Sequence, residues 1–478
     1  MLNQDVARRS FLKKAGQGLL AVPALSTFAA IGMAQARKAA SSGKKMRKGA
    51  EAAPEKPKIV LNVKEFGATG DGKTKDTAAI QEAVDRCWVL GGGEAVVPAG
   101  NYLTGAIALR SNTLLRLEKD AVLLGSPDFA DYPVAQVRWE GKWIQGHVAL
   151  IYGFDVEHTG VVGPGRIVGN SALGGRPNRQ NPLRHPALIE PIGCNDLRFE
   201  DFSSEYRLMW SIHPTYCENV TIKNLNIRST GGNGDGIDID STSHVHIDGC
   251  DISTGDDCIS IKSGRGSEAF DLLRTSEDIL ITNCTFADSI FACIGIGSET
   301  SGGIRNVRIE HCKFTRARTY AVYIKSRPGR GAFIEDIAGS DLDVSGTTGG
   351  FLRFNILNSG IQDQAPVPGL EGIPTIKNFR FSNIKVADCP ILVEGTGIHP
   401  DKPLDGFSLI DVTGTCGKGI YLANVKNAVI RDIKVTGLTG PLINIYNVTG
   451  KGLAGAAKIE APKVGPPVPT PAEPYQLH

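Results

Sequence analysis

Two short acidic runs hold the side chains of this chain that are best suited to chemistry. They span residues 233–240 and 253–262 and contain five aspartates, Asp235, Asp238, Asp240, Asp256 and Asp257. Each run joins alternating Ile residues, the pattern of a half-buried β-strand, to Gly residues that let backbone and carboxylates approach a ligand closely. Paired carboxylates in a groove are suited to acid and base roles at a glycosidic bond.

The spacing of the two runs predicts that their carboxylates meet. Asp235 and Asp256 are 21 positions apart, which is about one turn of a coil of short strands that pair about 4.8 Å apart. Consecutive strand residues face opposite sides, so Asp256 and Asp257 can reach one cleft only at a strand end or a bulge, which Gly255 makes possible. Carboxylates this close cannot all stay ionised easily, so we expect the pKa of one to rise and that group to hold a proton.

The elements that must position these runs are short, repeated strands. The 57 Gly residues and the scarcity of long helical periods favour strands and turns over a helical bundle. Four segments share one template, in which apolar and polar residues alternate around a central Asn, Gly or His: 219–228, 244–253, 278–287 and 306–315. Weaker copies follow at 376–386, 406–412 and 427–435. This loose period, roughly 20–35 residues, predicts a parallel β-helix, because a β-propeller blade needs about 40 residues.

A helix is predicted near the start of this array. Residues 76–87 form an amphipathic pattern with Asp76 as the expected N-cap. The glycine-rich segment 67–72 before it fits neither a dinucleotide-binding fingerprint nor a P-loop. We therefore expect the helix to cap one end of the strand stack rather than to bind a nucleotide.

The chain divides into four predicted regions. They are a twin-arginine signal peptide at 1–36, a disordered basic linker at 37–58, a β-helix catalytic domain at 59–460 and a proline-rich tail at 461–478. Arg8 and Arg9 precede an apolar stretch and a small-residue cleavage site, and an uncleaved membrane anchor is the alternative. No later apolar run is long enough to cross a bilayer, so we expect a periplasmic or extracellular protein without membrane contact after cleavage.

Charge and cysteine content argue against a nucleic-acid partner, disulfide bonds and a structural zinc site. Residues 1–58 hold 12 Lys or Arg and 3 Asp or Glu, which leaves 40 against 47 for the remainder. Because this remainder is mildly acidic, we expect no nucleic-acid partner. Cys250, Cys284 and Cys312 recur at one place in successive strand-like segments, which favours an inward stack of buried thiols over disulfides. No CxxC pair occurs among the ten Cys, so structural zinc is not expected.

Four sequence blocks together resemble the polygalacturonases, the pectin-cleaving glycoside hydrolase family 28. The blocks are Asn233-Gly-Asp235, Gly255-Asp-Asp257, Gly297-Ser-Glu-Thr-Ser-Gly-Gly303 and Tyr323-Ile-Lys325. The resemblance extends from about residue 59 to at least 440 and implies an all-β fold, a right-handed parallel β-helix with a short N-terminal capping helix. It also implies hydrolysis of α-linked galacturonan with inversion and no metal or organic cofactor. We expect a bacterial, exported monomer that acts on pectic polysaccharide or oligogalacturonide.

The resemblance assigns a role to each matching residue. Asp256 is similar in position to the general acid, and Asp235 and Asp257 to the pair that activates water. An inverting mechanism of this kind predicts acid and base carboxyl groups roughly 6.5 to 9.5 Å apart. Lys325 resembles a cation that binds a uronate carboxylate, and Asn233 is expected to orient Asp235 or the substrate.

Two departures from the family pattern bear on the substrate. The segment Phe291-Ala292-Cys293 stands where the family shows Gly-His-Gly, and Tyr323 stands where it shows Arg. Both lost groups would hold or polarise substrate, so a rhamnogalacturonan or another uronate- or rhamnose-containing pectic chain is an alternative to polygalacturonate. Arg327 and Arg330 are candidate replacement cations, and Tyr323 is a candidate to stack on a sugar face.

Two further classes of function remain open at this stage. Asp238 and Asp240 lie on one strand face and could bind calcium as in pectate lyases, which use the same scaffold but cleave by β-elimination. We prefer them as structural groups behind the catalytic aspartates. The other class is a β-helix that only binds polysaccharide, which would leave the carboxylate cluster without a purpose.

The export hypothesis predicts the behaviour of a double variant. Replacing Arg8 and Arg9 by Lys should leave the folded precursor in the cytoplasm, because twin-arginine transport depends on that pair. Cell fractionation measures the result, with Arg47→Lys as the control outside the pattern. Normal export of the double variant would remove the twin-arginine interpretation.

Overall fold

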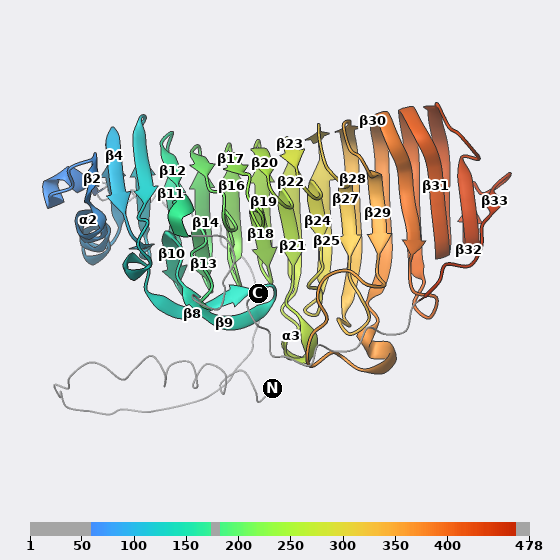
Figure 1. Ribbon diagram of the computed structural model, residues 1–478, viewed down its shortest axis with the longest axis horizontal. Coiled ribbons are helices and arrows are strands. Elements are labelled where there is room, and N and C mark those ends of the chain that lie inside the picture. Colours follow the sequence, from blue (N-terminus) through green and yellow to red (C-terminus); the bar gives the residue numbers. More distant parts are fainter. Residues whose placement is uncertain (1–58, 174–181, 465–478) are drawn as a thin grey trace, which may run out of the picture. The chain divides into compact units, whose positions relative to one another are not determined.

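The computed structural model describes residues 59–173 and 182–464. The described chain is a right-handed parallel β-helix, in which short strands of successive coils pair in parallel along one axis (Figure 1). The predicted fold class is therefore confirmed. The predicted signal peptide, the linker and residues 465–478 of the tail lie outside the described residues.

Three rows of parallel strands build the coils. The first row contains β1 (Val60–Asn62), β3 (Gly93–Val97), β6 (Thr113–Leu117), β11 (Glu157–Val162), β14 (Asn195–Glu200), β16 (Glu218–Lys223), β19 (Ser243–Asp248), β22 (Ser276–Thr282), β25 (Ile304–Glu310) and β28 (Phe333–Val344). The second contains β2 (Asp71–Lys75), β4 (Gly100–Thr104), β7 (Ala121–Gly125), β12 (Arg166–Val168), β15 (Ser203–Glu205), β17 (Asn226–Ser229), β20 (Asp251–Thr254), β23 (Thr285–Ser289) and β26 (Lys313–Phe314).

The third row carries the acidic runs. It contains β5 (Ile107–Ala108), β10 (Ile151–Phe154), β13 (Ile189–Ile192), β18 (Ile237–Asp240), β21 (Ile259–Lys262), β24 (Ile294–Ile296), β27 (Tyr320–Lys325) and β29 (Gly350–Asn355). The later strands β30 (Thr375–Gly397), β31 (Leu404–Thr436) and β32 (Ile443–Lys451) continue around the corners of the coil, and β33 (Ala457–Lys458) follows. The two acidic runs therefore end in neighbouring strands, β18 and β21.

The repeated template corresponds to a corner between the first two rows. Its central residue has a left-handed backbone in each copy, with φ of 53° at Asn224, 65° at Gly249, 54° at Asn283 and 55° at His311. Gly, Asn, Asp and His tolerate this region better than other residues, which explains why the template centres on them. The side chains also bond along the stack, as where Asn283 Nδ2 donates to Asp248 Oδ1 at 2.8 Å.

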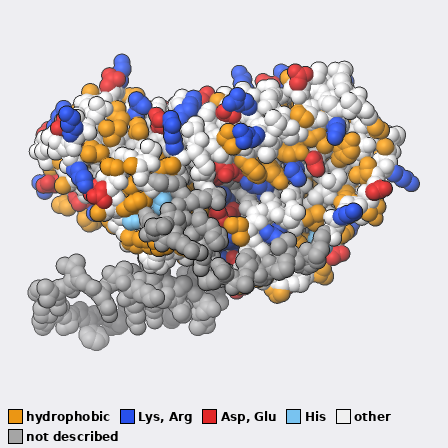
Figure 2. All heavy atoms as spheres, viewed as in Figure 1, with side chains coloured by type: hydrophobic (Ala, Val, Ile, Leu, Met, Phe, Trp, Pro, Cys, Tyr) orange, Lys and Arg blue, Asp and Glu red, His pale blue; other side chains and the backbone are white. Residues whose placement is uncertain are grey.

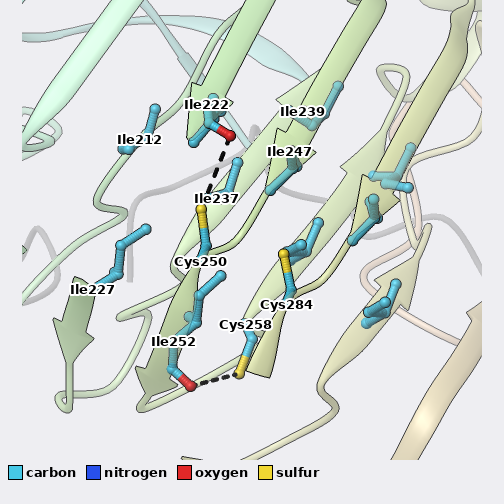
Figure 3. Close-up of a cluster of buried hydrophobic side chains, with 14 of the residues drawn as sticks. Ile212, Ile222, Ile227, Ile237, Ile239, Ile247, Cys250, Ile252, Cys258 and Cys284 are labelled. Atoms are coloured by element: carbon cyan, nitrogen blue, oxygen red, sulfur yellow. Dashed lines mark hydrogen bonds between the residues drawn. The ribbon is translucent and has the colours of Figure 1, made fainter. Parts of the chain in front are cut away.

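Rows of Ile and small thiols fill the interior of the coil (Figure 3). Figure 3 shows Ile237, Ile239 and Ile252 beside Cys250 and Cys284 in this interior. All ten cysteines are buried and free, so the predicted thiol stack is confirmed and no disulfide forms. Burying each such aliphatic side chain contributes about 1.5–3 kcal/mol to folding.

The helix α2 (Thr77–Val89) covers the first coils, at the blue end of the chain in Figure 1. Its buried face, which includes Ile80 and Val84, contacts β1, β3 and β6. Asp76 stands at the N-cap position, as predicted, but its carboxylate makes no capping bond to the helix. It instead accepts hydrogen bonds from the backbone of Thr69 and Gly70 at 2.7 and 3.0 Å, which fixes the preceding glycine loop.

Three insertions lie together along the lower side of Figure 1 and border the third row. They are the hairpin of β8 (Val134–Trp139) and β9 (Lys142–His147), the loop with α3 (Gly266–Leu272) and the segment 356–374 with the 3-10 turn Gly369–Gly372. Asp363 joins them, since its Oδ2 lies 3.0 Å from Lys142 Nζ and 3.5 Å from Arg265 Nε.

Two surface properties complete the description. Neither helix in the described ranges is long and apolar enough to cross a membrane. Over the described part of the face in Figure 2, basic side chains are interspersed with acidic ones instead of forming a stripe. Such a mixed surface gives no electrostatic footprint for a nucleic acid on that face.

Candidate active site

The register of the third row decides which residues of the acidic runs face outward. Ile237 pairs with Ile259, and both belong to the apolar interior. Side chains alternate along a strand, so Asp238 and Asp240 of β18 lie on the outer face beside Ser260 and Lys262 of β21. The next strands add Gly295 and Tyr323 to the row that begins with Asp238.

Three aspartates meet just before these strands begin. Asp235 and Asp257 each stand two residues before the paired Ile237 and Ile259, so they occupy equivalent places in successive coils. One oxygen of each of Asp235, Asp256 and Asp257 lies within 4.8 Å of the others. Asp235 and Asp257 are buried, whereas Asp256 is half-buried and reaches solvent. The structure thus brings together the three residues predicted to be catalytic.

Their spacing differs from the expected one. The nearest oxygens are closer than the 6.5 to 9.5 Å expected between the carboxyl groups of an inverting pair. The fold accounts for the closeness of Asp235 and Asp257, because residues at equivalent places in successive coils are separated by about one strand spacing, ~4.8 Å. Asp235 is equivalent to Asp257 and not to Asp256, since the coil here is one residue longer than the 21-position interval suggested.

A close turn holds Asp256 in place. A Cβ atom on Gly255 would lie 1.9 Å from the carbonyl oxygen of Gly231, so only glycine fits between the two turns. Asp256 follows β20 at its end, and its backbone carbonyl accepts hydrogen bonds from Thr254 Oγ1 at 2.7 Å and Ser289 Oγ at 2.8 Å. Asp256 and Asp257 lie between the end of β20 and the start of β21, and their reach into a substrate cleft stays a prediction.

A serine links the two buried carboxylates. Ser260 Oγ lies 3.1 Å from Asp235 Oδ2 and 3.0 Å from Asp257 Oδ2. A hydroxyl has a single proton, so Ser260 donates to one of these oxygens at a time and couples the protonation states of the two groups.

Two buried lysines supply the positive charge of the site. Lys325 Nζ lies 2.5 Å from Asp257 Oδ2, and Lys262 Nζ lies 2.5 Å from Asp238 Oδ1 and 3.6 Å from Asp235 Oδ2. Lys325 reaches Asp257 across the intervening coil because Gly295 has no side chain. A Cβ atom on Gly295 would lie 2.2 Å from Asp257 Oδ2 and 2.9 Å from Lys325 Nζ.

The charges of this cluster require some of the carboxyl groups to keep their protons. Burial, together with the charges of Asp235 and Asp257, raises the pKa of Asp256 to about 8. Burial also raises the pKa of Asp235 against the opposing charge of Lys262, and burial raises that of Asp238 well above its ordinary value. Four carboxylates face two ammonium groups, so a neutral Asp256 relieves the excess negative charge and holds a proton that it can donate.

The departures from the family pattern lie in contact with each other. The Phe291 and Tyr323 rings stack with their centroids 5.7 Å apart and an interplanar angle of 22°. Lys325 Nζ lies 4.8 Å from the centroid of the Phe291 ring and 5.8 Å from that of Tyr323, so both rings pack against the ammonium group. Tyr323 is buried at 6% exposure, and Phe291 already covers one of its faces.

Arg327 and Arg330, the two candidate replacement cations, are both buried and donate to backbone carbonyl oxygens. Arg330 is fully buried, and its guanidinium donates to the carbonyl oxygens of Ser298 and Ile361. Burial lowers its pKa to about 9. In the structure the group contacts the 356–374 segment through Ile361, and its contact with substrate stays a prediction. Arg327 is also buried and donates to the Gly360 carbonyl at 2.5 Å, and its substrate contact stays a prediction.

Asn233 stands at the turn before the first catalytic candidate. Its backbone has a left-handed φ of 58°, and the residue is buried. It stands two positions before Asp235 in the sequence. Asn tolerates this conformation well. Its orienting role stays a prediction.

Several residues of the site were not singled out from the sequence. Ser260 and Lys262 alternate with the buried Ile residues of β21, as Asp238 and Asp240 do in β18. This alternation in the sequence could have indicated that they face outward. Trp210 packs its ring 4.5 Å from Lys262 Nζ. Nothing in the sequence indicates that contact, because it joins separate coils.

The outward aspartates of β18 have cationic partners. Asp238 pairs with Lys262, and Asp240 Oδ2 accepts from Arg138 Nε at 3.0 Å. Burial opposes ionisation of Asp240, but Arg138 outweighs it and the pKa of Asp240 lies below its ordinary value. These partners favour a structural role over calcium binding. The spacing of Asp235, Asp256 and Asp257 would allow a divalent ion, but two ammonium groups already lie against that cluster.

Comparison with known proteins identifies the family of this chain. The model of glycosyl hydrolases family 28 matches residues 91–352. The chain is 28% identical over 362 residues to the Vitis vinifera protein named "Probable polygalacturonase", with 73% of each chain covered. It is 30% identical over 375 residues to polygalacturonase-2 of Solanum lycopersicum, with 75% of this chain and 76% of that protein covered. The solved structure of a hyperthermoactive exopolygalacturonase from Thermotoga maritima matches with a TM-score of 0.65 and 25% identity, covering 79% of this chain and 93% of that one.

The gap left by Gly295 generates a prediction. In Gly295→Ala the added methyl group must displace Asp257 or Lys325, and a misplacement of about 1 Å costs roughly 10²-fold in rate. We expect a loss of that size in turnover on any glycosidic substrate that the unchanged protein cleaves, with the melting temperature nearly preserved. Gly440→Ala is the control, because its Cβ would meet nothing within 4 Å. Equal activity of both variants would show that the contact between Lys325 and Asp257 is dispensable.

Proposed function

Since the chain belongs to glycosyl hydrolases family 28 and is a glycosyl hydrolase, we propose that it cleaves the α-linked galacturonic acid chain of pectic polysaccharide. The observation that carries this proposal is the cluster of Asp235, Asp256 and Asp257, in which one half-buried carboxyl group retains its proton beside two buried ones. That arrangement supplies both the acid and the base that glycoside hydrolysis needs.

The proposed roles follow from exposure and charge. Asp256 reaches solvent and holds a proton near neutral pH, so it donates that proton to the leaving glycosidic oxygen. Asp235 lies beside Lys262, and Asp257 lies beside Lys325. They draw a proton from the attacking water, and inversion at the anomeric carbon follows if this water attacks from the face opposite the leaving group.

A second candidate substrate is favoured by one specific observation. The stacked Phe291 and Tyr323 rings replace groups that would hold or polarise a galacturonate. A more apolar wall beside Lys325 suits a chain in which a deoxy sugar such as rhamnose alternates with a uronate. Rhamnogalacturonan-type hydrolysis is therefore the alternative within the same family.

We also propose that the protein is bacterial and exported by the twin-arginine route. Arg8 and Arg9 with the following apolar stretch support this, as does the set of ten free thiols, which is compatible with folding in a reducing compartment before export. A monomer remains our proposal for the oligomeric state.

One assay tests the proposed reaction. Incubation with polygalacturonate and with rhamnogalacturonan should release reducing ends without ultraviolet absorbance, because only β-elimination makes a conjugated double bond. We expect faster turnover on polygalacturonate, and NMR of the first product should show inverted anomeric configuration. Absorbing products would establish a lyase, retention would overturn the role given to Asp235 and Asp257, and preference for rhamnogalacturonan would select the alternative substrate.

The role of Asp256 predicts both a rate loss and a pH effect. Asp256→Asn should lower turnover by about 10²- to 10⁴-fold or more, because the proton donor is lost. In the unchanged protein the alkaline limb of kcat/KM should lie near pH 8, where the coupled carboxyl groups lose the donor proton. This limb should disappear in Asp256→Asn.

Stability measurements separate this loss from unfolding. The folded pKa of Asp256 lies above its ordinary value of 3.8, so the folded protein binds the proton more tightly and loses stability as pH rises from about 4 to about 8. Asn cannot ionise, so Asp256→Asn should melt at the same or a higher temperature than the unchanged protein at pH 7. Asp432→Asn, on the exposed surface, is the matched control. Near-normal turnover of Asp256→Asn would end the assignment.

A further inference from the structure

We propose that Arg353 binds a free carboxylate of the substrate in a subsite on the C-terminal side of the catalytic cluster. The inference rests on the proposed function, because it names the group on the pectic chain that this part of the cleft recognises. It also replaces Arg330 as the cation that compensates for Tyr323.

The register places Arg353 in line with the active site. Arg353 of β29 pairs with Tyr323 of β27, which in turn pairs with Gly295 of β24. The same row leads back to Ser260 and Asp238. Arg353 is therefore an outward residue of the catalytic row, three coils beyond Ser260 and one beyond Tyr323.

Its guanidinium is held by aromatic rings rather than by an acid. Arg353 Cζ lies 5.1 Å from the Tyr323 ring centroid and 5.4 Å from that of Tyr320. The neighbouring carboxylate of Glu394 accepts a hydrogen bond from Tyr320 Oη at 2.7 Å. Among the described residues Arg353 makes no ion pair, and its Nε is buried without a hydrogen-bond partner. By contrast, the buried Arg138 and Arg184 each face a carboxylate.

A pocket of about 420 Å³ lies in front of this group. Its polar lining includes Arg353, Asn355, Asn358, Thr396 and Lys463, with Glu394 and Glu460 also present. Asn355, which lines this pocket, pairs with Lys325 in the strand register, so the pocket begins one coil beyond the lysine that contacts Asp257. Amide, hydroxyl and ammonium groups of this kind suit the hydroxyls and the carboxylate of a uronic acid residue.

The chemistry of the group decides which substrate it prefers. A guanidinium presents two parallel N–H donors that match the two oxygens of a carboxylate, and this one lies over the Tyr323 ring. Methyl esterification removes the charge of the uronate and the acceptor strength of one oxygen. We therefore expect the subsite to require an unesterified galacturonate.

The test compares two substrates across matched variants. Arg353→Gln should lower kcat/KM on de-esterified polygalacturonate about 10- to 100-fold, the loss expected for a hydrogen bond to a charged group, with little change on highly methyl-esterified pectin. Arg353→Lys should recover part of the preference. Arg308→Gln, an exposed surface change on β25, should match the unchanged protein on both substrates.

The selectivity ratio distinguishes recognition from a structural role. If Arg353 only supported Tyr320 and Tyr323, Arg353→Gln would lower both activities together or shift the melting temperature, and that outcome would overturn the proposal. An unchanged ratio at full activity would overturn it as well.

A binding measurement keeps this inference separate from the proposed function. If the unchanged protein cleaves neither pectic substrate, the proposed function fails, and calorimetry with trigalacturonate then tests the subsite directly. Binding that is lost in Arg353→Gln but kept in Arg308→Gln would support a carboxylate site without hydrolysis. No binding to the unchanged protein would overturn the inference itself.

Discussion

The distance between paired parallel strands is the constraint on which this site depends. Each coil adds one strand about 4.8 Å further along the axis, so equivalent residues of successive coils form rows at that spacing. Asp235 and Asp257 are adjacent members of such a row, and Ser260 bridges them because it follows in the same strand. Strand pairing thus holds the carboxylates close together. The favourable free energy of the rest of the fold offsets their mutual repulsion.

Two ammonium groups and a bound proton, rather than solvent, offset the repulsion between these carboxylates. Lys262, from the same coil as Asp257, and Lys325, from two coils further on, pair with buried carboxylates. Asp256 keeps its proton because ionising it would add a further negative charge to a poorly hydrated site. A functional cluster of this kind lowers stability locally, and the long apolar rows inside the coil supply the stability that tolerates it.

The insertions place additional side chains beside the third row of strands and leave the pairing of those strands unchanged. Arg138, from the hairpin of β8 and β9, donates a hydrogen bond to Asp240 of β18. Asp363 ties that hairpin and the α3 loop to the segment 356–374. The strand ladder therefore determines where the chemistry occurs, and the loops determine which groups surround it.

The sequence alone determined the elements whose signals are local. The left-handed residues at Asn224, Gly249, Asn283 and His311 repeat because each corner needs one, so the β-helix was predictable. The buried thiols and the meeting of Asp235, Asp256 and Asp257 followed from the same repeat. Tertiary structure decided what depends on register across coils of unequal length. It placed Asp235 level with Asp257, buried Arg330 against a distant loop and placed Arg353 over the Tyr323 ring. Strand pairing and loop packing join these residues, which no sequence spacing relates.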